Sequence, residues 1–397
     1  MGIARGTNIV RDGLKFGYDN GYGVSNNTTA TRFNKGEPTT NLQSSNQTSG
    51  QIAGMQGVAL TYVGEENGYS KYSMSGTFSA GTYPYCMYLP GVSFSGGTAY
   101  STQIKLKTNV PNKFNNIGGG INYVNEPMNT AGTNSSVLQS DGFYHIRRDG
   151  FNYVSTTAQS GYIHSNPVNN TTFNSSTDFI YVKHFQIEQN THCTPWTATY
   201  RSNTQGLIDL KRTENINLSG MSFDSSAQID FDGTNDDIAG FDFNLEAMDT
   251  STLEAIIYMD DLGGSDSSYS IFGGVATGNR HGYHEIRNSG SGWKMTHWTS
   301  ANGWRYANTA LSAGQYYHVV WVWNELKLSW YLNGVADGDY TFTTFSPYSL
   351  GFNHIGSFGS TGRYMDGKIP VAKLYQKALT AAEVKQNFDA YKNRFNI

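Results

Sequence analysis

The chain has 397 residues, and only 15% of them are charged, against about 25% in an ordinary soluble domain. Its formal net charge of −4 at pH 7 excludes the basic footprint of a nucleic-acid-binding protein. The 45 glycines, 27 tyrosines and 21 phenylalanines predict an all-β fold, because glycine is a poor helix former and aromatic residues favour strands. The length exceeds what one hydrophobic core supports, which predicts two domains.

The N-terminal residues do not resemble a secretory signal, and the number of cysteines is too small for a disulfide framework. The first residues, MGIARGTNIV, contain no apolar signal segment, and no apolar run reaches membrane-spanning length. We therefore expect a protein made in a cytoplasm, without a signal peptide and without a membrane partner. Cys86 and Cys193 are the only cysteines and fit no metal-binding pattern. Two free thiols are expected, and one bridge between them is the alternative.

Segments with β-strand character recur along the chain, separated by short clusters of Gly, Asn, Ser and Thr. This spacing is typical of β-sandwiches and barrels. The clearest predicted strands lie at 58–63, 101–107, 142–146, 179–188, 253–259, 316–323 and 326–332. Of these, YYHVVWVW at 316–323 is apolar nearly throughout and predicts a central strand that is covered on both faces.

Four aspartates lie close together in the middle of the chain, and calcium is the one cofactor that the sequence suggests. Oxygen-rich loops of this kind can hold calcium. The candidate ligands are Asp230, Asp232, Asp236 and Asp237. The alternative is a turn at 232–236, DGTND, in which Asp and Asn side chains cap their own backbone. Both interpretations stay open on the sequence alone.

The acidic residues do not predict a hydrolase. Glycoside hydrolysis requires two carboxyl groups that face each other across a cleft, and alternating acids on one strand would aim them the same way. Glu254 is followed only by Asp260 and Asp261, which belong to a turn with Gly263 and Gly264. Motifs of serine hydrolases, zinc proteases and nucleotide-binding loops are absent. We therefore expect no enzyme, and a glycoside hydrolase is the least favoured function.

The segment 290–306, GSGWKMTHWTSANGWRY, is the best candidate for ligand recognition. Aromatic rings stack on the apolar faces of sugars, and neighbouring polar side chains bind the hydroxyl groups. Trp293 and Trp298 are expected in the core, which is also the alternative for Trp304 and Tyr306. The predicted carbohydrate-binding residues are Trp304, Tyr306, Arg305 and Asn302.

The segment 326–332 is expected to end in a tight hairpin. Its apolar residues alternate with Lys327, Ser329 and Tyr331, so one face is predicted to be buried. The alternating apolar residues are Leu326, Leu328, Trp330 and Leu332. Asn333 and Gly334 follow directly, and this dipeptide is the one best able to adopt the positive φ angles of a two-residue turn.

One helix is predicted, at the C-terminus. Thr380 and Glu383 form a capping box, and Leu379 and Val384 have the spacing of a hydrophobic staple. The apolar stripe of the helix comprises Val384, Phe388, Tyr391 and Phe395. This spacing predicts that the helix packs one face on a domain surface.

The C-terminal half resembles the concanavalin A-like, laminin G-type lectin sandwich, in which a strand and a helix close the fold. The matching segments lie at 227–238, 251–259, 314–323, 328–334, 354–357 and 365–391. GLKFGYDN at 13–20 looks like the opening strand of the same family. The resemblance implies one sandwich formed by 1–30 and 202–397, with a second sandwich, 31–201, inserted in a loop. Two consecutive domains with an N-terminal arm are the alternative.

The segment 31–201 is similar to carbohydrate-binding-like jelly rolls in virion proteins of tailed bacteriophages. The resemblance rests on GEPTTNL at 36–42, FQIE at 185–188 and TPW at 194–196. It implies a phage virion structural protein, such as a tail fibre, that displays lectin-like sandwiches for attachment to host-surface glycans. The alternative is a capsid or tail decoration protein that acts by protein contact. Other virion proteins are then the expected partners, and a homo-oligomer would have to form through sandwich faces, because no heptad segment is present.

Overall fold

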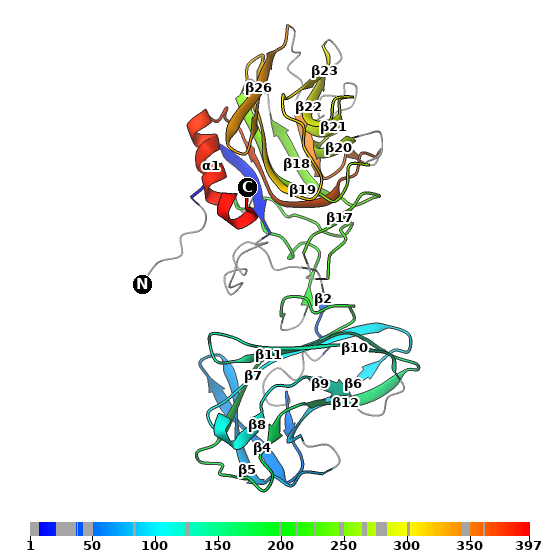
Figure 1. The fold of residues 1–397 in the computed structure, drawn as a ribbon, viewed down its shortest axis with the longest axis vertical. Helices are drawn as coiled ribbons and strands as arrows, with labels where there is room; N and C mark the ends of the chain where they lie inside the picture. Colours follow the sequence, from blue (N-terminus) through cyan, green and yellow to red (C-terminus); the bar gives the residue numbers. More distant parts are fainter. Residues whose placement is uncertain are drawn as a thin grey trace. The chain divides into compact units, whose positions relative to one another are not determined.

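The computed structural model describes most of the chain, and the described residues fall into two compact units (Figure 1). The described residues are 8–20, 37, 39–42, 51–81, 85–123, 128–197, 200–211, 213–225, 228–245, 250–263, 268–274, 284–299, 302–343, 350–359 and 362–397. Unit 1 comprises 1–38, 202–224 and 228–397, and unit 2 comprises 39–201 and 225–227. The predicted boundary at 30/31, together with Ala227 and Gly264, lies outside the described residues.

Unit 1 is built from two antiparallel sheets. The order of the first is β1 (Leu14–Asp19), β28 (Asp366–Tyr375), β19 (Thr250–Met259), β24 (Tyr316–Asn324), β25 (Lys327–Leu332) and β26 (Val335–Thr341), with β17 (Phe231–Asp232) also paired to β28. The order of the second is β18 (Ile238–Leu245), β27 (Leu350–Ile355), β20 (Ser268–Gly273), β21 (His284–Asn288), β22 (Trp293–Thr299) and β23 (Gly303–Tyr306). Figure 1 shows blue β1 and red α1 in this one unit, although they come from opposite ends of the chain.

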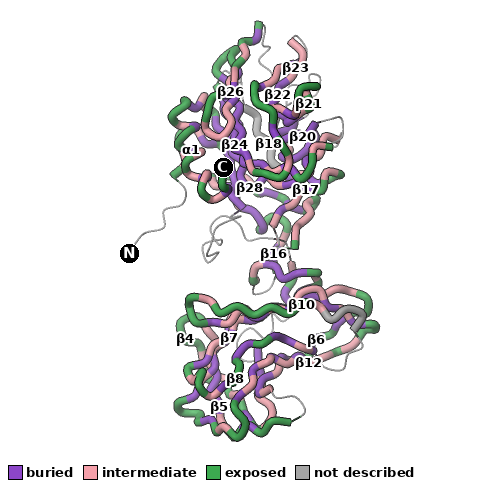
Figure 2. The backbone as a smooth tube through the Cα atoms, in the orientation of Figure 1, coloured by how far each residue is buried: buried purple, intermediate pink, exposed green. Residues whose placement is uncertain are grey.

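The core of unit 1 lies between these two sheets, because every second side chain of a strand points inward toward the facing sheet. Leu253 and Trp321 of the first sheet and Ile271 and Met295 of the second belong to one cluster of buried side chains. Figure 2 shows the buried backbone running through the central strands, including β24. The predicted central strand at 316–323 is therefore confirmed.

The predicted hairpin after β25 is confirmed, with one correction. Asn333 and Gly334 have φ angles of 50° and 76°, as a two-residue turn of this type demands. Leu326, predicted on the buried face, is instead 39% exposed. The strand begins one residue later, because Glu325 takes a left-handed φ of 54° and Leu326 is the second residue of the turn between β24 and β25.

The predicted C-terminal helix is α1 (Ala381–Phe395), and its capping box is present. The Thr380 side chain accepts a hydrogen bond from the Glu383 backbone, while the Glu383 carboxylate accepts one from the Thr380 backbone. Leu379 and Val384 pack in one cluster, as the predicted staple requires. The helix covers the outer face of the first sheet, since Tyr391 and Phe395 cluster with Ile256 and Val371 there.

Unit 2 is a second sandwich. Its larger sheet has the order β10 (Met128–Leu138), β11 (Tyr144–Tyr153), β7 (Ala99–Thr108), β15 (Phe179–Glu188), β5 (Tyr69–Thr77) and β14 (Thr172–Phe173), with β4 (Val58–Glu66) paired to β5. The facing sheet has the order β3 (Ala53–Gly54), β6 (Met87–Phe94), β12 (Thr157–Ile163) and β9 (Ile121–Tyr123). Two short pairs join β13 (Asn166–Pro167) to β8 (Phe114–Asn116) and β16 (Tyr200–Arg201) to β2 (Thr39–Thr40). The core between the sheets includes Ile104, Ile180, Met87 and Ile163.

The two cysteines match the sequence prediction. Cys86 and Cys193 are both free and buried. No helix within the described ranges is long and apolar enough to cross a membrane.

We propose that unit 2 is an autonomous domain inserted into a loop of unit 1. The first and last strands of unit 2 pair with each other, with Thr40 opposite Tyr200, so the chain enters and leaves at one place. Strand β1 precedes the insertion and pairs with β28 near the C-terminus. It contributes Phe16 and Tyr18 to the core of unit 1, and both are fully buried. Such an arrangement leaves unit 1 complete when the insertion is removed.

The insertion predicts different behaviour for three fragments in thermal unfolding. A fragment of residues 35–203 should unfold cooperatively, and residues 1–30 joined to 204–397 by a Gly/Ser linker should do so as well. A fragment of 204–397 should melt about 10 °C or more below the linked version, because it lacks the two buried aromatic side chains of β1. Equal melting temperatures for 204–397 and the linked version would instead indicate two consecutive domains.

Candidate functional site

Two tryptophans face each other on the outer surface of the second sheet of unit 1. Strands β22 and β23 pair at one edge of this sheet, with Trp298 opposite Trp304 and Thr296 opposite Tyr306. Opposed residues of an antiparallel pair project from the same face. The ring centroids of the two tryptophans are 6.4 Å apart, and both side chains are half-buried. Trp298, which was predicted in the core, therefore belongs with Trp304 and Tyr306, whereas Trp293 is a core residue as expected.

Two guanidinium groups lie against the Trp304 ring. The Cζ atom of Arg287 is 4.3 Å from the ring centroid, and that of Arg363 is 5.7 Å from it. Arg363 is itself held by the buried carboxylate of Glu285, with 2.5 Å between Nη1 and Oε1. Lys294 is directly opposite Arg287 on the neighbouring strand and adds positive charge. We call Trp298, Trp304, Tyr306, Arg287 and Arg363 the tryptophan–arginine face.

The structure divides the four predicted sugar-binding residues between two sides of β23. Arg305 alternates with Trp304 and Tyr306, and its Cζ atom lies 4.5 Å from the centroid of Tyr340. Asn302 accepts a hydrogen bond from the Tyr340 hydroxyl at 3.4 Å and donates one to Thr299 at 3.2 Å. Trp304 and Tyr306 thus share one side of β23, and the guanidinium groups that lie beside Trp304 are those of Arg287 and Arg363.

Two residues beside Trp304 that the sequence analysis did not assign to the candidate site, Trp298 and Arg363, differ in how far the sequence could have indicated them. Trp298 could have been found from the hairpin, because pairing β22 with β23 puts it opposite Trp304. Arg363 is distant in the chain and is brought there by the loop that precedes β28, so no local pattern points to it.

The four aspartates of the predicted calcium site do not converge. Asp232 Oδ1 accepts hydrogen bonds from the backbone of Thr234 and Asn235 at 2.8 and 3.1 Å, as in the capped turn. Asp236 accepts one from the Asp232 backbone at 2.9 Å, and burial raises the pKa of Asp236. Asp230 is paired with Lys368 and Asp237 with His354. In the part of the chain that the structure describes, no three His, Cys, Asp or Glu side chains are grouped to hold a metal.

Glu285 of β21 and Asp237, which directly precedes β18, each contact a basic side chain. Glu285 is buried and forms an ion pair with Arg363. Asp237 contacts Nδ1 of His354 and also accepts a hydrogen bond from Ser357 at 3.3 Å. In a Ser-His-Asp triad the serine bonds to the other imidazole nitrogen, so this trio lacks an activated nucleophile.

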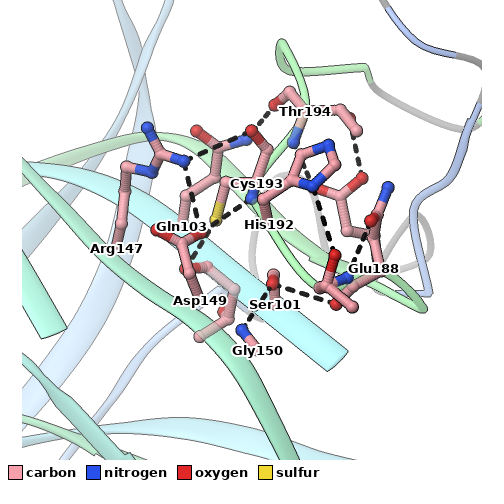
Figure 3. Close-up of polar contacts among 12 residues, drawn as sticks. Ser101, Gln103, Arg147, Asp149, Gly150, Glu188, His192, Cys193 and Thr194 are labelled. Carbon is pink, nitrogen blue, oxygen red and sulfur yellow. Dashed lines mark hydrogen bonds and ion pairs between the residues drawn. The ribbon is translucent and has the colours of Figure 1, made fainter. Parts of the chain in front are cut away.

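Glu188 of the FQIE motif and Thr194 of the TPW motif form a buried hydrogen-bonded cluster in unit 2, which we call the clasp (Figure 3). The Glu188 carboxylate accepts hydrogen bonds from the Thr194 backbone at 2.8 Å and from the hydroxyls of Thr194 and Thr39, each at 2.7 Å. Gln186 donates to the same carboxylate at 2.7 Å. Beside it, Gln103 donates to the Thr194 carbonyl at 2.6 Å. The clasp fastens the end of β15 to the segment where the chain leaves unit 2.

Cys193 lies in the same buried network, and Figure 3 shows its contacts. Its backbone N–H donates to Asp149 at 2.7 Å, and its thiol donates to the Thr102 carbonyl at 3.2 Å. Arg147 donates to Asp149 at 3.2 Å. Burial raises the pKa of the Cys193 thiol well above its ordinary value, which disfavours the thiolate that nucleophilic chemistry requires.

Comparison with known protein families agrees with the two-sheet geometry of unit 1, which is that of a lectin-type β-sandwich. Residues 232–385 match the family model described as the concanavalin A-like lectin/glucanases superfamily. Unit 1 therefore carries a concanavalin A-like lectin/glucanase domain of the laminin G type, closed by the C-terminal helix. A comparison with curated proteins found no match.

Several solved structures are similar to part of the chain. Domain 4 of an extracellular arabinanase from Geobacillus stearothermophilus, in complex with arabinotriose, is 15% identical; the match covers 40% of this chain and 75% of that one, with a TM-score of 0.33. A sialidase from Trypanosoma rangeli is 16% identical, with 47% and 31% covered and a TM-score of 0.37. The receptor-binding domain of botulinum neurotoxin D is 12% identical, with 48% and 51% covered and a TM-score of 0.35.

Proposed function

We propose that this chain is a non-enzymatic adhesion protein of a tailed-phage virion, and that its tryptophan–arginine face binds glycans of the host surface. The observation that carries the proposal is the pair of half-buried rings, Trp298 and Trp304, with Arg287 and Arg363 beside them. The outer face of the other sheet is covered by α1, so the two faces of the sandwich differ in what they offer a ligand.

The composition of this face suits a sugar ligand. Indole rings supply a flat apolar surface, and the guanidinium groups supply N–H donors in fixed positions. Contacts with Arg287 and Arg363 hold the Trp304 ring in place, which reduces the entropy lost on binding. Because Arg287 and Lys294 add positive charge, glycans that carry a carboxylate or phosphate should bind better than neutral ones.

The virion assignment and the absence of catalysis rest on further observations. The resemblance of 31–201 to phage virion modules supports the first, and low charge with abundant Tyr, Asn, Ser and Gly suits an adhesive surface. The ion pair of Glu285 and the contacts of Asp237 support a binding site without hydrolysis.

A glycan array tests the proposal. The full chain should show saturable binding to at least one bacterial surface glycan, and Trp304→Ala should weaken that binding about tenfold or more, since central aromatic anchors each contribute about 2 kcal/mol. Trp196→Ala removes an exposed indole from unit 2 and should leave binding unchanged. Equal binding by wild type and Trp304→Ala would show that the tryptophan–arginine face is not the glycan-binding site.

A second candidate function is decoration of the particle by protein contact. Strand β10 is a long edge strand of unit 2, and its exposed run includes Val137 and Leu138, which are 62% and 58% exposed (Figure 2). An exposed edge strand with apolar side chains can pair with a strand of another protein. No binding to any glycan on the arrays, together with co-purification of a capsid or tail protein, would favour this function.

A further inference from the structure

The smaller sheet of unit 2 presents a row of polar and aromatic side chains on its outer face. Tyr88 of β6 is directly opposite Tyr162 of β12, and Tyr162 is in turn opposite Asn122 of β9. All three side chains are half-buried. Their neighbours Met87 and Ile163 point to the other side and are fully buried in the core, so the row faces outward.

A groove with a volume of about 440 Å³ lies over the two tyrosines of this row. Its lining residues are Met55, Tyr88, Ala158, Gln159, Ser160 and Tyr162. A bulge in β6 between Leu89 and Val92 shifts the register with β12 at the groove, because two residues of β6 lie opposite the single residue Ser160. Bulges of this kind change the direction of side chains and recur next to binding sites. The groove falls within the roughly 300–1,000 Å³ range of small-ligand sites.

Further aromatic rings extend the row of tyrosines. Tyr85 lies 6.4 Å from Tyr162, measured between ring centroids, and stacks on His164 at 4.4 Å with an interplanar angle of 12°. The three tyrosines thus form a strip that continues beyond the lining of the groove.

We propose that this groove is a second ligand site of the chain and that it binds a neutral oligosaccharide. Two tyrosine rings offer stacking surfaces for successive sugar rings, while the Gln159 amide and the Ser160 hydroxyl can bind sugar hydroxyls. None of the six lining residues carries a charge, so the groove offers no counter-ion to an acidic sugar or to a charged peptide. The proposal rests on the proposed function for its ligand class, but it uses a different unit and a different set of residues.

The two sites differ in the charge that they offer, and this gives the chain two complementary specificities. The tryptophan–arginine face of unit 1 is cationic, whereas the groove of unit 2 is neutral. Two sites on one chain would raise the avidity for a surface that displays both kinds of sugar.

Calorimetric titration of the full chain tests the groove directly. The probes are maltohexaose, cellohexaose, xylohexaose and mannohexaose, with hexagalacturonate as the acidic comparison. At least one neutral hexasaccharide should bind, and Tyr88→Ala and Tyr162→Ala should each lower its affinity about tenfold, since stacking contributes on the order of 1 kcal/mol or more. Tyr88→Phe keeps the ring and should bind within about threefold of wild type. Tyr181→Ala, on the larger sheet, should bind normally.

The outcomes separate this proposal from the function assigned to unit 1. Loss of neutral-sugar binding in the Tyr88 and Tyr162 variants, with normal binding in Trp304→Ala, supports the groove. Loss in Trp304→Ala alone overturns the groove and leaves the proposed function intact. Absence of binding to every neutral probe, or binding of hexagalacturonate in preference to them, also overturns it. An unchanged melting temperature of each variant confirms that the fold is retained.

Discussion

Replacing Glu254 by Gln is expected to lower the free energy of unfolding of unit 1 by about 3–5 kcal/mol, because it leaves a buried lysine without its counter-charge. Lys373 Nζ lies 2.5 Å from Glu254 Oε1, and both side chains are buried under α1. Burial lowers the pKa of Lys373 below its ordinary value, so this ammonium group depends on the Glu254 carboxylate to stay charged. Six of the seven tryptophans are in unit 1, so tryptophan fluorescence during urea unfolding measures the change.

Glu254 also joins four elements of unit 1, which increases the expected loss. His318 of β24 contacts Glu254 Oε1 at 3.0 Å, and Asn387 of α1 donates to Oε2 at 2.6 Å. Asn387 in turn accepts a hydrogen bond from the backbone of Val10 at 2.7 Å. One carboxylate thus connects β19, β24, β28 and the terminal helix, and the helix connects to the N-terminal segment.

The pH dependence of stability provides a second check on Glu254. Burial alone would raise the pKa of Glu254, but the Lys373 charge and the His318 hydrogen bond outweigh it and lower the pKa from 4.5 to about 2. A carboxyl group with a depressed pKa stabilises the fold above its unfolded value of about 4.5, and the stabilisation disappears as the pH falls toward 2. At neutral pH it amounts to about 3 kcal/mol. The difference between wild type and Glu254→Gln should therefore shrink between pH 4.5 and pH 2.

Two control variants make the result specific. Asp389→Asn removes the exposed ion pairs of α1 with Lys385 and Lys392, and it should leave the unfolding midpoint unchanged. The double variant Glu254→Leu/Lys373→Met removes both buried charges and should be more stable than Glu254→Gln. A double variant as unstable as the single one would show that the buried lysine is not the cause of the loss.

Glu188→Gln is expected to destabilise unit 2 by about 2–4 kcal/mol. Glu188 is fully buried, and its carboxylate accepts hydrogen bonds from Gln186, from Thr39 and from both the backbone and the hydroxyl of Thr194. A glutamine amide would present two N–H groups to some of these donors, and a lost hydrogen bond to a charged group costs about 1.5–3 kcal/mol. Hydrogen exchange of the β15 amides, followed by mass spectrometry, measures the effect.

The matched control for Glu188 is Glu66, which forms an exposed ion pair with Lys71 on the same unit. Glu66→Gln should leave the exchange of β15 unchanged. If Glu188→Gln exchanged at the wild-type rate as well, the clasp would have no role in the stability of unit 2.

Local sequence signals predicted the local structure well. The capping box at Thr380 and Glu383 and the Asn333-Gly334 turn both appear as expected, because each depends on residues only a few positions apart. Asn387 was missed because an amide within an apolar stripe looks like a surface residue, whereas its partner Glu254 is 133 positions away.

The candidate site was only partly predictable for the same reason. Trp304 and Tyr306 were identified from composition, but their real neighbours depend on strand pairing and on a distant loop. Successive side chains of a strand point to opposite faces, so Arg305 and Trp304 lie on different faces of the sheet. This placement could have been predicted from the sequence of the strand alone. Arg287 and Arg363 required the assembled sheet, because they approach Trp304 from β21 and from the segment before β28.

Immunogold electron microscopy of virions tests the proposed virion role most directly, with antibodies raised against the full chain and applied to phage particles from the lysate in which the protein is found. We predict gold at the host-binding end of the tail or its fibres, where a glycan-binding adhesion protein would act. Labelling confined to the capsid would favour the decoration function instead. Particles that carry no label, although the protein is present in the lysate, would contradict the assignment to the virion.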